Sequence, residues 1–144
     1  MSIRTLLRTY YYLAKPGIVY GNSIAAIAGY FFGAAGDPNI ITFFSMLIGV
    51  ALVMASACVF NNILDRDIDA RMARTKRRAL VSGDVPLANA IVYGTTLLVV
   101  GTLLLAYGTN LLTLSVALFG FIAYVGPYTY STVSYTHLRA HETK

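Results

Sequence analysis

The sequence predicts an all-α protein that crosses a membrane with four helices. Of its 144 residues, 57% are hydrophobic and only 12% are charged, whereas about 25% of the residues in an average soluble domain are charged. This composition excludes intrinsic disorder, which needs low hydrophobicity and high charge. It also argues against an ordinary soluble domain, because so few charges would leave too much apolar surface in water.

The predicted spans are four stretches that lack Asp, Glu, Lys and Arg. A helix that crosses a bilayer needs about 20 apolar residues, and each stretch has about that length. Glycine and asparagine mark the short turns at 36–39 and 108–110, so the spans are expected to form two tight antiparallel hairpins. The spans cover residues 17–35, 40–60, 87–107 and 111–130.

A further helix is expected before the first span. Residues 3–14 place apolar side chains at helical spacing, which predicts an amphipathic helix at the membrane interface. Pro16 suits the first turn of the span that follows. Two Gly-x3-Gly pairs in that span, which begin at Gly17 and Gly29, predict close packing against another helix.

The basic residues predict the orientation in the membrane. Nine Lys and Arg residues lie before the first span or between the second and third spans, and neither short turn carries one. By the positive-inside rule, the N-terminus and residues 61–86 face the cytoplasm, in the inner (cytoplasmic) membrane of the cell. Lys15 is interpreted as an anchor of this topology. Because the net charge of +5 lies beside the spans, the lipid bilayer is an expected partner and nucleic acid is not.

The segment from Asn61 to Val85 contains four of the six acidic residues. If the second helix continues past Phe60, then one face carries Asn61, Asn62, Asp65 and Asp69, and the two aspartates lie one turn apart. Like charges at that spacing destabilise a helix. They suit Mg²⁺, however, which binds oxygen ligands and is typically held by one or two carboxylates together with substrate phosphates. Basic residues just downstream would then contact the phosphate oxygens.

Such a site implies the ionisation of a diphosphate ester. Mg²⁺ and cationic side chains would stabilise the leaving group, and an apolar chamber between the helices would hold a lipid tail and exclude water. Alternatively, the acidic and basic side chains pair with one another in a solvated loop that only orients the protein. The spacing alone leaves both interpretations open.

Three segments resemble a known family. The motif Asn61-x3-Asp65-x3-Asp69 resembles the first aspartate-rich motif of the UbiA superfamily of intramembrane prenyltransferases. The segments AKPGIVYGN (14–22) and DRDIDARMARTKRRALVSGDVP (65–86) are similar to its haem-farnesylating branch. The resemblance implies a bundle of about nine transmembrane helices around a central cavity, with two facing aspartate-rich motifs. It also implies Mg²⁺-dependent transfer of farnesyl from farnesyl diphosphate to a vinyl group of haem B, which gives haem O.

The resemblance also implies roles for individual residues. Asp65 and Asp69 would be the catalytic residues and, together with Asn61, would hold Mg²⁺ through the diphosphate. Asn22 is a candidate for lining the cavity. The residues implied to contact the diphosphate are Asn61, Arg74, Lys76 and Arg78.

The chain departs from the family pattern chiefly in its length. It holds four of about nine helices and one of two motifs, so we expect residues 1–130 to be the N-terminal part of a UbiA-type domain that is inactive alone. Residues 131–144 continue no upstream pattern and are expected to be a non-native tail, so their two histidines would have no function. Ala79 also replaces a common proline, and Asn62 a common aspartate.

Two other functions stay open. One is a UbiA-type prenyltransferase whose acceptor is an aromatic quinone precursor. The other, from a different class, is a small four-helix transporter or scaffold whose charged loop only sets the topology. In that case, replacing Asp65 or Asp69 by asparagine would leave the function intact.

Overall fold

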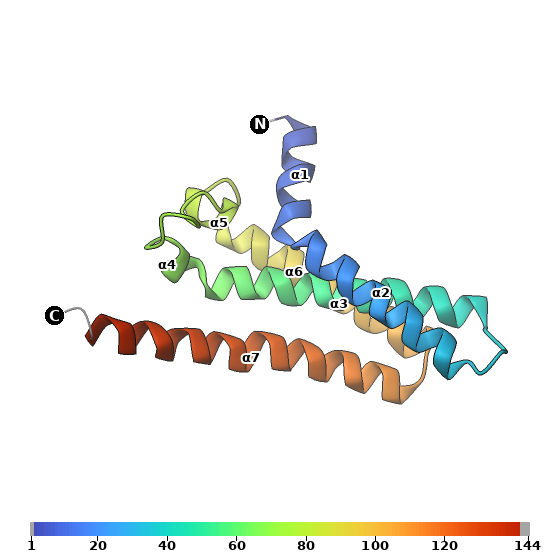
Figure 1. Cartoon of the computed structure of the whole chain (residues 1–144). Helices are drawn as coiled ribbons and strands as arrows, with labels where there is room; N and C mark the ends of the chain where they lie inside the picture. The colour runs from blue at the N-terminus through green and yellow to red at the C-terminus, as the bar shows by residue number, and fades with distance from the viewer. Residues whose placement is uncertain (1, 142–144) are drawn as a thin grey trace.

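A computed structural model describes the backbone of residues 2–141 and the side chains of residues 2–126. Within these limits the chain forms seven helices and no strand (Figure 1), which confirms the predicted all-α class. The helices are α1 (Ile3–Leu13), α2 (Pro16–Gly33), α3 (Ile40–Leu64), α4 (Arg66–Asp69), α5 (Ala79–Ser82), α6 (Leu87–Gly108) and α7 (Leu111–His141).

Helix α3 is the central helix of the bundle and contacts α2, α6 and α7 (Figure 1). Among the described residues, α3 and α6 are the helices long and apolar enough to cross a membrane. Helix α2 has 18 residues, but Pro16 and Asn22 make it less apolar. The apolar start of α7 covers Leu111–Gly126. All four predicted spans are therefore helical, and two of them have the length and composition of a membrane span.

Asparagine side chains cap the two helices that follow the short turns. Asn39 Oδ1 accepts hydrogen bonds from the backbone N–H groups of Ile41 and Thr42, both at 3.0 Å. In the same way, Asn110 Oδ1 accepts a hydrogen bond from the N–H of Thr113 at 2.8 Å. These contacts satisfy donors that the first turn of a helix leaves free. The predicted hairpin turns are thus confirmed, and their residues explain where α3 and α7 begin.

Glycines bring the backbones of α3 and α6 together. A Cβ atom on Gly101 would lie 2.9 Å from the carbonyl oxygen of Gly49, and a Cβ atom on Gly49 would lie 2.7 Å from Leu105 Cγ. By contrast, a Cβ atom on any glycine of α2 would meet no described atom within 4 Å. The described residues therefore do not pack against the pairs that begin at Gly17 and Gly29. Small residues do permit the close helix contact, but they lie on α3 and α6.

Replacing Gly101 by alanine is expected to destabilise the protein by about 1–3 kcal/mol, because the added methyl group overpacks the contact with α3. The matched control is Gly21→Ala in the interior of α2, where the space is open and alanine favours the helix by about 0.5–1 kcal/mol. Thermal unfolding in detergent measures both variants. Equal unfolding temperatures for the two variants would contradict the close contact.

Helix α1 is amphipathic and stands steeply to the bundle beside one end of α3 (Figure 1). Its outer residues Ile3 and Leu7 are 77% and 66% exposed, whereas Leu13 is 5% exposed and belongs to the core. Tyr10 packs edge-on against Tyr93 of α6, with 5.1 Å between the ring centroids. The predicted amphipathic helix is confirmed, and its docked end forms a wall beside the polar end of α3.

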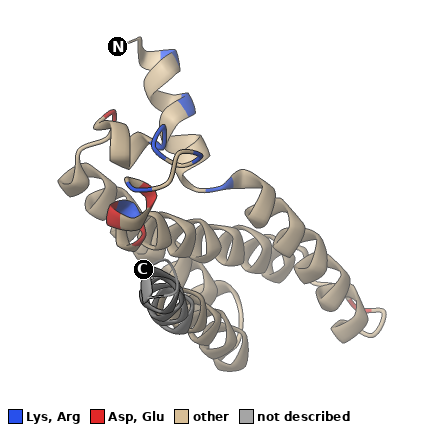
Figure 2. Cartoon of the chain, turned by 60° about the vertical axis from the view of Figure 1, so that its left-hand side comes forward, with Lys and Arg blue, Asp and Glu red and all other residues tan. Residues whose placement is uncertain are grey.

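The charges of the described residues gather at the end of the molecule where α1, α4 and α5 lie (Figure 2). Every Lys and Arg between residues 2 and 126 precedes α2 or lies between α3 and α6. At the opposite end, the turn between α2 and α3 carries Asp37 and no basic residue. The helices thus have one basic end and one nearly uncharged end, which is the distribution typical of an oriented membrane protein.

Candidate functional site

The motif Asn61-x3-Asp65-x3-Asp69 lies on helical backbone. Helix α3 ends at Leu64, Asp65 is its C-terminal cap, and α4 continues the chain to Asp69. The N–H of Asp65 donates to Asn61 O at 2.9 Å, and the N–H of Asp69 donates to Asp65 O at 2.8 Å. These bonds place the three side chains one turn apart, so the predicted continuation past Phe60 is confirmed.

Two of the three motif side chains are almost fully buried, with Asn61 1% and Asp69 5% exposed. Among the described residues, Asp65 Oδ1 and Asn61 Nδ2 are shielded from solvent and have no hydrogen-bond partner. Leaving such a buried atom unpaired costs about 1–3 kcal/mol, and most buried polar atoms in native proteins are paired. The Asn61 side chain nevertheless lies close enough to the Asp65 carboxylate to lower the pKa of Asp65, so these two polar atoms lie near each other without forming a close hydrogen bond.

Lys15 reaches this motif from the junction of α1 and α2. Its Nζ donates a hydrogen bond of 2.6 Å to Asn61 Oδ1, across 46 positions of sequence. Its backbone has φ 51°, in the left-handed region that residues other than glycine rarely adopt, so the packing around it must hold this conformation. Burial lowers the pKa of Lys15, and the carboxylates of Asp65 and Asp69 oppose that shift. Interpreting Lys15 only as a topology anchor missed this contact.

The loop between α4 and α5 folds back onto Asp69. Arg78 Nη1 donates to Asp69 Oδ2 at 2.5 Å, which is the one ion pair of the described chain. Thr75 Oγ1 donates to the backbone oxygen of Asp69 at 2.9 Å. Arg74 and Lys76 are exposed. Residues 70–78 form turns, so no helical spacing aligns these two side chains with Arg78. Of the three basic residues implied by the resemblance, the structure brings Arg78 to the motif.

Asn62 joins this end of α3 to α1. It is 7% exposed, and its Nδ2 donates to the backbone oxygen of Leu13 at 2.8 Å. Leu13 lies just before the left-handed turn at Lys15, so this bond supports the position from which Lys15 reaches Asn61. Its Oδ1 is shielded from solvent and has no hydrogen-bond partner among the described residues, and the side chain lines the polar cavity described below.

Opposite charges surround the Asp65 carboxylate. Burial raises the pKa of Asp65 above its ordinary value, and the Asp69 carboxylate raises it further. The cations of Lys15 and Arg78 lower it. Two carboxylates therefore share a partly dehydrated site that has cationic side chains at its edge. Such a site can bind a metal cation and an anionic ligand together.

The donor set of the motif fits Mg²⁺. No group of three or more His, Cys, Asp and Glu side chains placed to hold a metal ion occurs among the described residues. Asp65 Oδ1, without a protein partner, would be the first ligand, beside Asp69 and the amide oxygen of Asn61. Mg²⁺ commonly binds through one or two carboxylates and completes its shell with water and phosphate oxygens.

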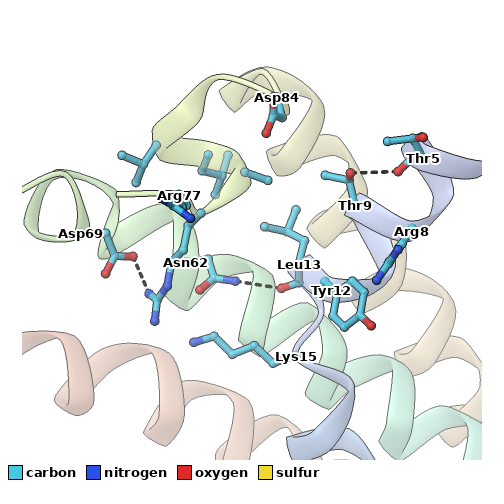
Figure 3. Close-up of a pocket in the computed structure, with 14 residues that line it drawn as sticks. Thr5, Arg8, Thr9, Tyr12, Leu13, Lys15, Asn62, Asp69, Arg77 and Asp84 are labelled. Carbon is cyan, nitrogen blue, oxygen red and sulfur yellow. Dashed lines mark hydrogen bonds and ion pairs between the residues drawn. The ribbon is translucent and has the colours of Figure 1, made fainter. Parts of the chain in front are cut away.

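Two cavities border the motif. A polar cavity of about 500 Å³ lies between α1 and the loop that precedes α5 (Figure 3). An apolar cavity of about 520 Å³ lies between α2, α3 and α7. Along α3 the apolar cavity ends at Ala57, and the polar cavity includes Asn62 and also Asp69 of α4. Asn61 thus lies on the chain between the two cavities, and Asp65 lies between two residues that line the polar one.

Asn22 lines neither of these cavities. Its Nδ2 donates to the backbone oxygen of Ile18, one turn earlier in α2, at 2.8 Å. The side chain is exposed on the described part of the molecule. Its role as a cavity residue stays a prediction, and its observed contact is within its own helix.

Comparisons with known proteins show the family of the chain. Residues 22–140 match the model of the UbiA prenyltransferase family. The protoheme IX farnesyltransferase of Francisella tularensis subsp. novicida is 47% identical over 127 residues, which are 86% of this chain and 45% of that protein. That of Pectobacterium carotovorum is 44% identical over 124 residues, which are 86% of this chain and 42% of that protein. The chain thus spans about half the length of these relatives. No solved structure matches it.

Proposed function

Because the chain belongs to the UbiA prenyltransferase family, we propose that it acts in the transfer of a farnesyl group from farnesyl diphosphate to a vinyl group of haem B. The names of its relatives support the acceptor. The observation that carries the proposal is the Asn61, Asp65 and Asp69 face, in which the buried oxygen Asp65 Oδ1 forms no close hydrogen bond among the described residues. Lys15 and Arg78 stand beside that face.

In this proposal the motif binds the diphosphate end of the substrate. Asn61, Asp65 and Asp69 would hold Mg²⁺, which would supply positive charge to stabilise the leaving diphosphate. Arg78 contributes a planar fork of donors that suits phosphate oxygens, and Lys15 contributes a point charge. Both cations are already held near the two carboxylates, so little reorganisation is needed when the leaving group becomes more negative. Arg74 and Lys76 would join only if the loop moved.

The apolar cavity is the proposed site of the farnesyl chain. Its α3 wall contains Met46, Val50, Val53 and Ala57, which recur every three or four residues and therefore share one face of the helix. The same face continues into Asn61. A chain lying in this cavity would place its diphosphate at the motif and keep its reacting carbon away from bulk water.

The proposed reaction transfers farnesyl C1 from a diphosphate oxygen to a vinyl carbon. The bond between farnesyl C1 and the diphosphate oxygen breaks, and the diphosphate keeps the electron pair. The allylic cation forms a carbon–carbon bond with the terminal vinyl carbon, which moves the positive charge to the carbon beside the macrocycle. Water adds its oxygen there and releases a proton, so the product carries a hydroxyl group. The residues of this chain stabilise the first step and exclude water until the second.

The charge distribution supports an orientation in the proposed inner membrane. We propose that the basic end with α1, α4 and α5 (Figure 2) faces the cytoplasm, as the positive-inside rule requires. Farnesyl diphosphate would then enter from the cytoplasmic side, with its charged group at the surface and its chain between the helices.

The test uses a chimera, because the chain spans about half of its relatives. Residues 1–126 replace the segment that they match in the Francisella tularensis protein, and membranes are supplied with haem B, farnesyl diphosphate and Mg²⁺. Formation of haem O, detected by chromatography, supports the proposal. Membranes that hold the folded chimera but make no haem O, or that farnesylate an aromatic acid instead, would overturn it.

Replacing Lys15 by methionine is expected to raise the KM for farnesyl diphosphate about tenfold, because a charged hydrogen bond of about 1.5–3 kcal/mol is lost at the phosphate site. The substitution keeps most of the side-chain length and removes the donor to Asn61. Arg4→Gln is the control, since Arg4 is exposed on α1 and its replacement removes the same amount of charge. Equal KM values for the two variants would show that Lys15 acts only as a topology anchor.

A further inference from the structure

The polar cavity continues beyond the motif to a second group of cations. Its lining includes Arg8 from α1 and Arg77 from the loop before α5, which the proposed diphosphate site does not use (Figure 3). These residues are 69 positions apart in sequence, and only the docking of α1 brings them to one cavity. Its volume of about 500 Å³ lies within the usual range of about 300–1,000 Å³ for small-molecule sites.

Neither arginine is neutralised by the protein. The single ion pair of the described residues joins Arg78 to Asp69, so Arg8 and Arg77 have no carboxylate partner there. The guanidinium of Arg8 lies over the ring of Tyr12, 5.5 Å from its centroid. The second acidic residue of the lining, Asp84, accepts a hydrogen bond from Ser82 at 2.7 Å. The cavity therefore has an excess of positive charge, which favours an anionic ligand.

The surroundings of the cavity favour an amphiphilic ligand. Its wall includes the buried apolar residues Leu13 and Leu80, each at most 5% exposed. Helix α1, which forms one side, exposes Ile3 and Leu7 and has the pattern of a helix at the membrane interface. The cavity thus combines cationic donors, an apolar wall and a position beside the proposed reaction site. A freely soluble anion without an apolar part would make no favourable contact with the apolar wall.

We propose that Arg8 and Arg77 bind the propionate carboxylates of the haem acceptor. This inference rests on the proposed function and assigns a site to the second substrate. Protohaem carries its two propionates on the edge opposite its vinyl groups, so holding the carboxylates at the α1 end would direct the vinyl edge toward the motif. Guanidinium groups suit carboxylates because they can donate two parallel hydrogen bonds.

The test compares haem B with its dimethyl ester, in which both propionates are blocked. Each is titrated by absorbance against the chain in phosphatidylcholine nanodiscs, for the wild type, R8Q, R77Q and the double variant. The wild type is expected to bind haem B about tenfold more tightly than the ester, and the double variant is expected to lose that difference. Arg4→Gln and Arg71→Gln are matched controls, because both residues are exposed arginines of the same two segments outside the cavity.

Three outcomes would overturn the inference. The first is equal binding of haem B and the ester by the wild type. The second is a loss of discrimination that is no larger in the double variant than in the controls. The third is an effect of R8Q and R77Q that needs anionic lipid in the disc and is the same for acid and ester, which would make the cavity a lipid headgroup site.

The chimera tests the proposed function independently of the propionate site. The chimera is compared with its R8Q/R77Q double variant. If both make haem O with the same KM for haem B, the proposed function stands and the proposed propionate site is wrong. If the chimera makes no haem O while folded, the proposed function itself fails. The two results are distinguishable because binding of the acceptor and formation of product are measured independently.

Discussion

Replacing Asp65 by asparagine is expected to reduce farnesyl transfer by the chimera about a hundredfold or more without lowering its stability. Asp65 Oδ1 forms no close hydrogen bond among the described residues. The Asn61 amide, which lowers the pKa of Asp65, can donate to the amide oxygen of the variant as well, so the change removes a ligand charge at little cost in hydrogen bonding. Burial and the Asp69 carboxylate both raise the pKa of Asp65, which means that its charged form is disfavoured in the folded protein. A neutral amide relieves that repulsion.

The measurement pairs an activity assay with thermal unfolding. Haem O formation is followed over a range of Mg²⁺ concentrations, and unfolding is followed in the same detergent. Asp67→Asn is the matched control, because Asp67 is an exposed aspartate of the same helical turn and points away from the motif. Transfer by D65N at the rate of D67N would exclude a role for the motif and would favour the alternative of a loop that only sets the topology.

Replacing Arg78 by glutamine is expected to lower both activity and stability. Asp69 is 5% exposed and Arg78 is its ion-pair partner, so the variant leaves a buried carboxylate without its cation. Because the Arg78 side chain is itself 39% exposed, solvent screening limits the expected loss of stability to about 1–2 kcal/mol. Activity is expected to fall about tenfold to a hundredfold, since the leaving diphosphate also loses a bidentate donor.

A double variant separates the two effects. D69N combined with R78Q removes both members of the pair, so most of the lost stability is expected to return while the activity stays low. Arg71→Gln, an exposed arginine of the same segment, controls for the loss of one positive charge. If the double variant is no more stable than R78Q alone, the ion pair is not the source of the stability that Arg78 contributes.

Local features of the sequence were enough to predict the motif face. Asn61, Asp65 and Asp69 are spaced four residues apart, and each of the two backbone hydrogen bonds that join them also spans four residues. Spacing within a helix is set by backbone geometry, so no distant contact is needed to know which side chains align. The turns were predictable for a related reason, because glycine and asparagine between two apolar stretches mark them locally.

Contacts between distant segments were not predictable in this way. The sequence around Lys15 does not indicate that this residue contacts Asn61. The contact depends on how α1 docks on α3 and on the left-handed backbone of Lys15 between α1 and α2. Arg78 could not be separated from Arg74 and Lys76, because the loop has no helical periodicity and its turns decide which guanidinium reaches Asp69. The glycines that pack were also missed, since Gly49 and Gly101 do not form a short local pattern.

The sequence by itself determined the class of the protein, its membrane-spanning helices, its charged end and the face of the aspartate motif. These follow from composition, hydrophobic periodicity and helical spacing, which are local properties of the chain. Only the tertiary structure decided which cations stand beside Asp65 and Asp69, which glycines bring helices together, and that Arg8 and Arg77 share a cavity. These depend on the docking of α1, α3 and α6, where side chains far apart in sequence compete for the same buried space.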